Sequence, residues 1–146
     1  MTNRANHAFP GPDNVYRTQL DNGITLLVRE NHAAPVVVLD GYLAVGSIHE
    51  PADRAGLASF TASLLTRGSS RYDFDSFNET VEAVGASVSA GAGDHQTSFS
   101  TESLAEDFPQ MVELLADVLR RPTFPTEQIE RVRGQWLVRL QEREQN

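Results

Sequence analysis

The chain has 146 residues, 40% of them hydrophobic, which is enough for one globular domain with a buried core. It is acidic, with 12 basic residues (all arginines) against 20 acidic ones and a formal charge of −8, and it has no basic run that could neutralise phosphates; this argues against a nucleic-acid-binding surface. Cysteine is absent, so disulfides, thiolate metal sites and a thiol nucleophile are excluded.

The first third of the chain is predicted to be mostly strands. Residues 1–14 are polar and contain a Pro-Gly-Pro sequence, which predicts a flexible lead-in. Residues 15–20 and 24–29 are predicted to form two strands, and the Asn-Gly pair between them is typical of a hairpin turn. Residues 36–45 are apolar on both faces, which predicts a central strand.

Helices and a second pair of strands follow. Residues 56–68 have apolar side chains at helical spacing and end in a glycine, which predicts a short buried helix. A second helix is predicted over residues 73–84, with Asp73 or Asp75 as its cap and a glycine at its end. Residues 86–92 and 96–101 are predicted to be short strands.

The last part of the chain predicts two longer helices. The first covers residues 103–119, with Ser103 and Glu106 as a capping box. Its predicted core face consists of Leu104, Phe108, Met111, Leu115, Val118 and Leu119. The second begins within residues 123–127 and runs to about Glu144. The order ββ-β-α-α-ββ-α-α predicts an α+β fold in two layers, a largely antiparallel sheet with helices on one face.

Six short pieces of the chain, in this order and spacing, resemble the pitrilysin, insulinase and mitochondrial processing peptidase family of inverted-zinc metallopeptidases. They are Leu20-Asp21-Asn22-Gly23-Ile24, Val45-Gly46-Ser47 with Glu50, Gly56-Leu57-Ala58, Val84-Gly85-Ala86, Leu114-Leu115-Ala116-Asp117 and Pro122-Thr123-Phe124-Pro125. The resemblance implies that residues 15–146 form one peptidase-like domain, and we expect this domain to be truncated at its C-terminal end.

Active members of this family bind zinc through the two histidines of His-x-x-Glu-His and a glutamate on a later helix. By resemblance, the first histidine falls on Ser59, the general base on Ala62 and the second histidine on Ser63. The third ligand falls on Arg139, and a supporting glutamate falls on Val132. Zinc sites use Cys, His, Asp and Glu, and alanine cannot abstract a proton. We therefore expect no catalytic residue, no metal ligand and no zinc cofactor here.

Arg139 would place a permanent cation where the metal should lie. It falls near the apolar stripe of the final helix, which consists of Ile129, Val132, Trp136 and Leu140. We predict that Arg139 fills the vestigial pocket and hydrogen-bonds the two serines, backbone carbonyls or a carboxylate. The alternative is that Arg139 follows the edge of the helix into solvent.

The family often pairs one active with one inactive domain. The resemblance therefore implies a non-catalytic subunit that pairs with a zinc-competent sister or self-associates, and that encloses or binds a peptide or unfolded polypeptide. The matching family strand pairs with extended substrate, which implies peptide-binding residues at Ser89, Ala90, Gly91 and Ala92. Alternatively, a neighbouring segment covers this edge.

Two other functions stay open: a zinc endopeptidase whose ligands come from elsewhere, and a purely structural scaffold subunit. Serine hydrolysis is not favoured, because no Gly-x-Ser-x-Gly sequence is present. The longest apolar run is broken by Pro35 and is too short to cross a bilayer, and the N-terminus has no apolar run typical of a signal peptide. We therefore expect a cytoplasmic protein without a membrane partner.

Overall fold

The computed structural model describes residue 11 and residues 13–144, which fall into two compact units that divide after Pro35. The first unit contains an antiparallel hairpin of β1 (Tyr16–Gln19) and β2 (Thr25–Val28). Gly23 in its turn has a φ of 87°, in the left-handed region that glycine adopts without strain. The predicted hairpin is confirmed, whereas the predicted lead-in lies almost wholly outside the described residues.

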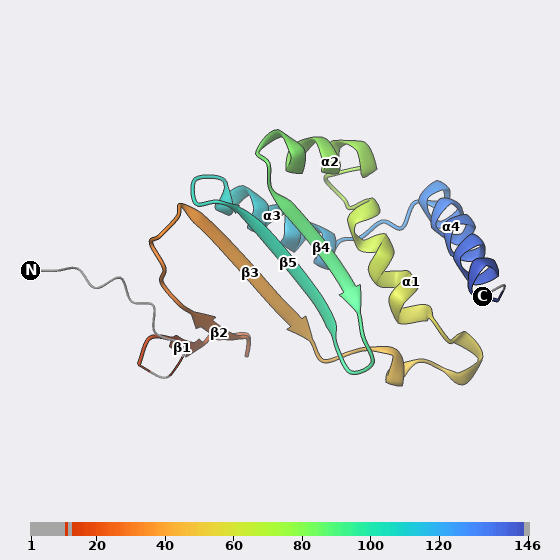
Figure 1. Ribbon diagram of the computed structural model, residues 1–146, viewed down its shortest axis with the longest axis horizontal. Coiled ribbons are helices and arrows are strands. Elements are labelled where there is room, and N and C mark those ends of the chain that lie inside the picture. The colour runs from red at the N-terminus through yellow and green to blue at the C-terminus, as the bar shows by residue number, and fades with distance from the viewer. Residues whose placement is uncertain (1–10, 12, 145–146) are drawn as a thin grey trace, which may run out of the picture. The chain divides into compact units, whose positions relative to one another are not determined.

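The second unit is built on a three-stranded antiparallel sheet (Figure 1). Its strands are β3 (Val36–Leu43), β4 (Ser87–Ala92) and β5 (Thr97–Leu104), in the order β3-β5-β4. The central strand is β5, and β3 has one strand neighbour in the described part of the chain, so the prediction of a central strand over residues 36–45 was wrong. The prediction assumed that the apolar side chains on both faces of β3 are buried. Those on one face are not: Val38 is 56% exposed.

Four helices accompany this sheet. They are α1 (Leu57–Leu64), α2 (Phe74–Ala83), α3 (Phe108–Arg120) and α4 (Thr126–Glu144). Short 3-10 turns occur at η1 (Ser47–His49), η2 (Ala52–Arg54) and η3 (Leu65–Arg67). Figure 1 shows α3 behind the sheet, α1 on the side of β4 that faces away from β5, and α4 next to α1. The predicted α+β class and the predicted order of elements are confirmed.

The start of α3 differs from its prediction. The helix begins at Phe108, and Ser103 belongs to β5, where it is buried and pairs with Val37 of β3. The capping box of Ser103 with Glu106 was therefore wrong, because a strand partner far away in sequence outweighed the local helix signal. Leu104 is also in β5 and is 40% exposed, so it does not belong to the core face of α3.

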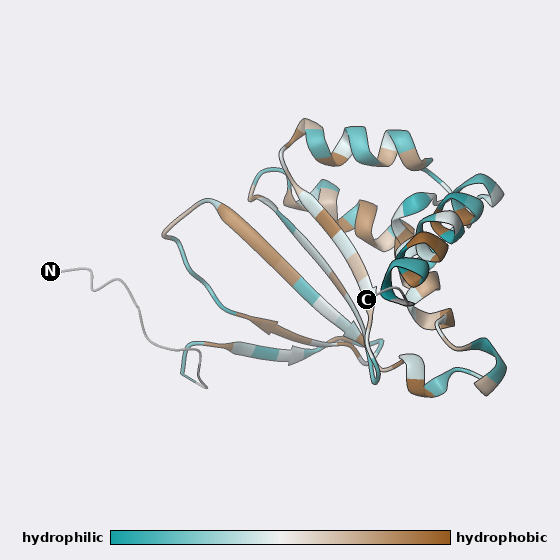
Figure 2. Cartoon of the chain, turned by 45° about the vertical axis from the view of Figure 1, so that its right-hand side comes forward, coloured by the Kyte–Doolittle hydropathy of each residue, from teal (hydrophilic) through white to brown (hydrophobic). Residues whose placement is uncertain are grey.

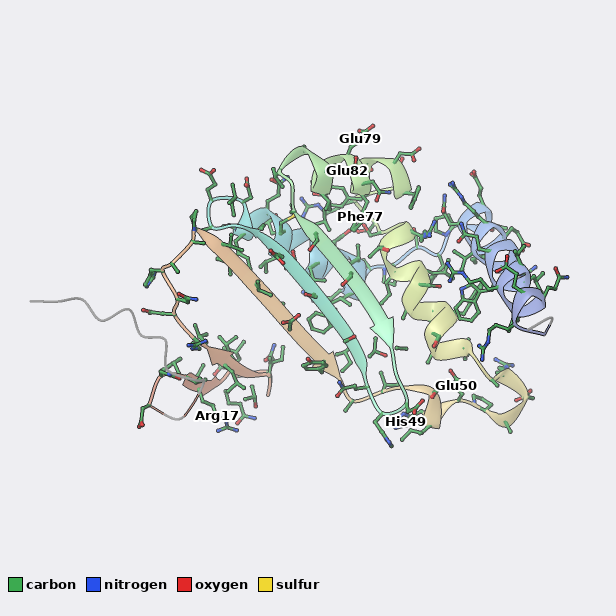
Figure 3. The ribbon with its side chains drawn as sticks, in the orientation of Figure 1. Arg17, His49, Glu50, Phe77, Glu79 and Glu82 are labelled. Atoms are coloured by element: carbon green, nitrogen blue, oxygen red, sulfur yellow. The ribbon has the colours of Figure 1, made fainter. Side chains whose placement is uncertain are left out.

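The core of the second unit lies between the sheet and the helices α2 and α3. It contains Phe77, Val81, Met111, Leu114, Leu115 and Val118. Phe77 and Val81 are four residues apart and share one face of α2, while Figure 3 shows Glu79 and Glu82 pointing away from the sheet. Figure 2 shows the same division as teal and brown residues along α2, and it shows strong hydrophobic colour along the first half of β3.

Local signals fix the ends of α2 as predicted. The Asp73 carboxylate accepts a hydrogen bond from the Ser76 backbone N–H at 2.8 Å, and so caps the first turn. Gly85, with a φ of 61°, ends the helix in the left-handed region. Over residue 11 and residues 13–144, no helix is both long enough and apolar enough to cross a membrane.

Candidate functional site

The helix α1, which carries three of the five vestigial zinc-site positions, is held at its N-terminus by Glu50. The Glu50 carboxylate accepts hydrogen bonds from the backbone N–H groups of Gly56 at 2.8 Å and of Ala58 at 2.6 Å. These donors have no partner within a helix, and a carboxylate also complements the positive end of the helix dipole. Glu50 therefore fixes the position and direction of α1.

The turn after β3 is docked on the turn between β4 and β5. The backbone N–H of Ser47 donates to the Gly93 carbonyl at 3.0 Å, and that of Ile48 donates to the Asp94 carbonyl at 3.1 Å. The Ser47 hydroxyl also donates to the Asp94 carboxylate at 3.0 Å. Gly46 is buried here, and a Cβ atom on it would lie 2.4 Å from the Gly93 carbonyl oxygen. Only glycine fits this position.

Three vestigial positions lie on α1. The Ser63 hydroxyl donates to the Phe60 backbone carbonyl at 2.7 Å, so its proton is already used within the helix. Ala62 is 3% exposed and belongs to the core, and Ser59 is half-buried. None of these side chains offers the imidazole or carboxylate that zinc sites use.

The other two positions lie on α4, which approaches α1 through an aromatic contact. The rings of Phe60 and Trp136 pack edge to face, with centroids 5.3 Å apart and an angle of 85° between their planes. Val132, at the position of the supporting glutamate, is 1% exposed and is part of the core.

Arg139 is exposed, and no hydrogen bond joins it to Ser59 or Ser63, all three of which the structure describes. The prediction that Arg139 fills the vestigial pocket was therefore wrong. Trp136 makes the aromatic contact between the two helices, and the long arginine side chain can keep its guanidinium hydrated at little cost. Leu140 is exposed as well, so the apolar stripe of α4 does not reach its C-terminal end.

The five positions do not fit a zinc ion. Two hydroxyls, a methyl group, an isopropyl group and a guanidinium stand where two imidazoles and three carboxylates would be needed. In the part of the chain that the structure describes, no group of three His, Cys, Asp or Glu side chains could hold a metal ion.

The predicted peptide-binding residues Ser89, Ala90, Gly91 and Ala92 all lie on β4. The strand pairs with β5, and its other edge has no strand partner among residues 13–144. Exposed and half-buried residues alternate along β4, and the side chains from Ser89 to Ala92 are all small. Because α1 also lies on this side of β4 (Figure 1), an extended chain could pair with the backbone of β4 only where α1 leaves the edge uncovered.

The buried carboxylate of Asp117 joins α3 to the loop after η3. These contacts were not predicted from the sequence. Asp117 is 1% exposed and accepts hydrogen bonds from the Ser70 hydroxyl and the Arg71 backbone N–H, both at 3.2 Å. A guanidinium nitrogen of Arg121 lies 2.5 Å from the same carboxylate. Burial by itself raises the pKa of Asp117, but the hydrogen bonds from Ser69, Arg71 and Ser70 and the charge of Arg121 leave that pKa below its ordinary value.

The same loop is tied to the segment before α4. The Thr123 backbone N–H donates to the Gly68 carbonyl at 3.1 Å, and Ser69 forms an isolated antiparallel bridge with Pro122. A Cβ atom on Gly68 would lie 2.8 Å from the Pro125 ring. Several residues in the sequence pieces that resemble the family, such as Gly46, Glu50 and Asp117, therefore act in packing and hydrogen bonding. This explains how the fold can form without zinc-binding side chains.

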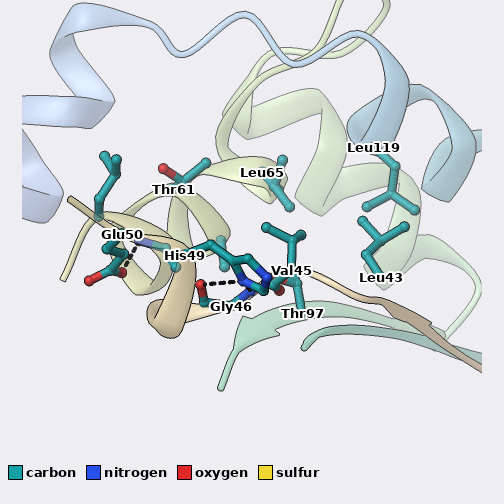
Figure 4. A pocket seen from close by; sticks show the side chains of 12 residues that line it. Leu43, Val45, Gly46, His49, Glu50, Thr61, Leu65, Thr97 and Leu119 are labelled. Carbon is teal, nitrogen blue, oxygen red and sulfur yellow. Dashed lines mark hydrogen bonds between the residues drawn. The ribbon is translucent and has the colours of Figure 1, made fainter. Parts of the chain in front are cut away.

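An apolar cavity of about 330 Å³ lies between α1 and the ends of β3 and β5 (Figure 4). It is lined by Leu43, Val45, Gly46, His49, Glu50, Leu57, Ala58, Thr61, Ala62, Leu65, Thr97 and Leu119. Ser59 and Ser63 are not among the lining residues, so the cavity and the two vestigial serines occupy different faces of α1. No local pattern in the sequence signals this cavity, because its walls come from distant segments.

Comparison with known proteins gives a consistent result. The family described as Insulinase (Peptidase family M16) matches residues 25–146. Cytochrome b-c1 complex subunit 1, mitochondrial, of Bos taurus is 30% identical over 125 residues, which cover 86% of this chain and 26% of that protein. Mitochondrial-processing peptidase subunit beta of Rattus norvegicus is 29% identical over 136 residues, which cover 91% of this chain and 28% of that protein.

A solved structure extends the comparison to the fold. The crystal structure of the peptidase M16 inactive domain from Pseudomonas fluorescens matches with a TM-score of 0.84 and 27% sequence identity, covering 91% of this chain and 32% of that one. The chain thus spans about a quarter to a third of the length of these relatives.

Proposed function

Because the chain belongs to the insulinase family of peptidases, family M16, we propose that it is a non-catalytic member that pairs with a zinc-competent sister subunit and helps to enclose or bind peptide. The observation that carries this proposal is the chemistry of the five zinc-site positions, Ser59, Ala62, Ser63, Val132 and Arg139. The relatives support it, since two are subunits by name and the solved structure is that of a domain described as inactive.

The contacts that position α1 and α4, here called the frame of the site, are present, while the side chains that would bind zinc or activate water are absent. Glu50 still caps α1, and Trp136 still joins α4 to α1. Buried Ala62 supplies neither a base nor a ligand, and Ser63 uses its proton within the helix. Hydrolysis of a peptide bond at this site would need both a metal-bound water and a base to activate it, and the side chains provide neither.

The unpaired edge of β4 supports a role in binding peptide. Extended chains add to such edges through backbone hydrogen bonds, and the small residues from Ser89 to Ala92 leave room for them. Peptide titration followed by backbone amide NMR tests this role. We expect amide signals between Ser87 and Ala92 to shift, and unmoved signals there would remove peptide binding from the proposal.

Metal analysis after dialysis, together with a peptide-cleavage assay, tests the loss of catalysis. We expect neither stoichiometric zinc nor cleavage; zinc held by residues of α1 would favour the zinc endopeptidase instead. A matched pair of variants tests whether the frame is intact: Ser59→His with Ser63→His, and the same pair with Arg139→Glu added. Because Arg139 is exposed and is not joined to Ser59 or Ser63 by a hydrogen bond, we expect the two variants to bind zinc equally; tighter binding with the glutamate would show that residue 139 can reach a metal held by α1.

A structural scaffold subunit is the second candidate, favoured by the similarity to a subunit of the cytochrome b-c1 complex. Co-expression with a zinc-competent sister, followed by sizing and activity measurements, separates the two. We expect a complex whose peptidase activity exceeds that of the sister alone. A complex with unchanged activity and no affinity for peptide would favour the scaffold. The cytoplasmic location expected from the sequence stays a prediction.

A further inference from the structure

Two arginines from different elements approach the ring of Phe74, the first residue of α2. The guanidinium carbon of Arg67, in η3, lies 4.8 Å from the centroid of this ring. The guanidinium carbon of Arg131, on α4, lies 5.6 Å from the same centroid. Cation–π attraction therefore holds both long side chains close to one aromatic ring.

These two cations have no ion-pair partner among the described residues, although the chain is rich in acids. The ion pairs found within residue 11 and residues 13–144 do not include Arg67 or Arg131. The nearest acids along the chain are otherwise engaged: Glu130 pairs with Arg133 at 2.8 Å, and Asp73 accepts hydrogen bonds from Ser76. The pKa of Arg67 is lowered by its partial burial and by the charge of Arg131. No carboxylate among the described residues thus lies within ion-pair distance of either guanidinium.

We propose that Arg67 and Arg131 form a binding site for an oxyanion, either a carboxylate or a phosphate. A planar guanidinium presents a rigid fork of N–H donors that matches the oxygens of both groups. The ring of Phe74 already restricts both side chains, so little further conformational freedom is lost when an anion binds. Arg131 is exposed and Arg67 half-buried, which leaves the pair accessible from solvent.

The proposal does not depend on the binding of peptide at the edge of β4. The oxyanion could belong to a peptide, as an acidic side chain or a C-terminal carboxylate, or it could be free phosphate. If the arginines only pack against Phe74, added anions will have no specific effect on them. The two interpretations therefore differ in a measurable way.

Titration of the whole chain with inorganic phosphate, at constant ionic strength maintained with chloride, tests the proposal. The readout is the NMR signal of the arginine Nε–H groups, and we expect saturable shifts for Arg67 and Arg131. Arg131→Gln should weaken phosphate binding by about tenfold, because one of two charged contacts is lost. Arg133→Gln is the matched control, since Arg133 is exposed on the same helix and already paired with Glu130, and it should bind phosphate as the unchanged chain does.

The test uses a substitution of Arg131 because this side chain is exposed, whereas replacing half-buried Arg67 could also disturb folding. A short peptide with one glutamate and an amidated C-terminus, and its glutamine counterpart with the same amidated end, distinguish the sources. Competition with phosphate by the glutamate peptide alone assigns the site to a peptide carboxylate, and no competition assigns it to free oxyanions. The absence of saturable shifts with both phosphate and the glutamate peptide would overturn the proposal, as would equal weakening by Arg131→Gln and Arg133→Gln.

Discussion

The substitution Asp117→Asn should destabilise the second unit strongly. It keeps the shape of the side chain but removes the charge that faces Arg121 at 2.5 Å. It also points an amide group at the Ser70 hydroxyl and the Arg71 N–H, which are both donors to the carboxylate. The Arg121 side chain is 58% exposed and stays hydrated without its partner, so the loss is that of charge-assisted hydrogen bonds to a buried carboxylate. Hydrogen bonds to charged groups contribute about 1.5–3 kcal/mol, and we expect a loss of free energy of unfolding in this range. Native proteins have a free energy of unfolding of roughly 5–15 kcal/mol, so the variant should still fold and its unfolding should be measurable.

Urea unfolding followed by far-UV circular dichroism measures this loss, and the chain offers a matched control. Glu113→Gln removes the other acidic partner of Arg71, an exposed pair at 3.7 Å, and should cost less than about 1 kcal/mol. The two variants thus compare a buried and an exposed carboxylate near the same loop.

The pH dependence of the effect gives an independent check. The folded pKa of Asp117 is depressed, so its stabilising contribution is complete above its unfolded pKa, about 3.9, and is lost as the pH falls through the folded pKa. The difference in unfolding free energy between the unchanged chain and Asp117→Asn should therefore shrink below about pH 4. A difference that stays constant between about pH 3 and 7, or a cost no larger than that of Glu113→Gln, would refute the argument.

Three further substitutions test the architecture around α1 and α4. Gly46→Ala places a methyl group 2.4 Å from the Gly93 carbonyl and should cost about 3 kcal/mol in urea unfolding; a neutral result would show that the docked turn can move away. Gly134→Ala lies within α4 with no atom near the added Cβ, so it should raise the unfolding free energy by about 1 kcal/mol, and a loss of thermal stability would contradict an open helix surface there. Glu50→Gln leaves one acceptor for two backbone donors and should cost about 1–2 kcal/mol, with faster hydrogen exchange at Gly56 and Ala58; unchanged exchange would mean that water replaces the cap.

The elements that could be predicted from the sequence are those whose signals are local. The hairpin turn at Gly23, the cap of α2 at Asp73 and the apolar spacing along α1 each act within a few residues. That the Ser59 side chain is a poor zinc ligand also follows from the sequence, because residue identity alone settles whether a side chain can bind a metal; the assignment of this position to a former zinc site stays a prediction.

The features that could not be predicted depend on partners far away in sequence. The residues around Ser103 predict a helix cap, but the pairing of Ser103 with Val37 makes it part of β5. The place of β3 at the side of the sheet follows from the pairing of all three strands and not from its own composition. The exposure of Arg139 is set by how α4 approaches α1, which no spacing along α4 reveals. Asp117 and Ser70 are 47 residues apart, and neither carries a local signal of the other.

The edge-to-face contact of Trp136 with Phe60 gives the chain a natural optical reporter. Trp136 is the single tryptophan of the sequence, and its half-buried indole lies between α1 and α4. Its fluorescence therefore senses the separation of the two helices that carry all five vestigial zinc-site positions. Any event that moves one helix against the other, such as docking of a sister subunit or metal capture by a redesigned α1, should change the emission of Trp136 without any added label.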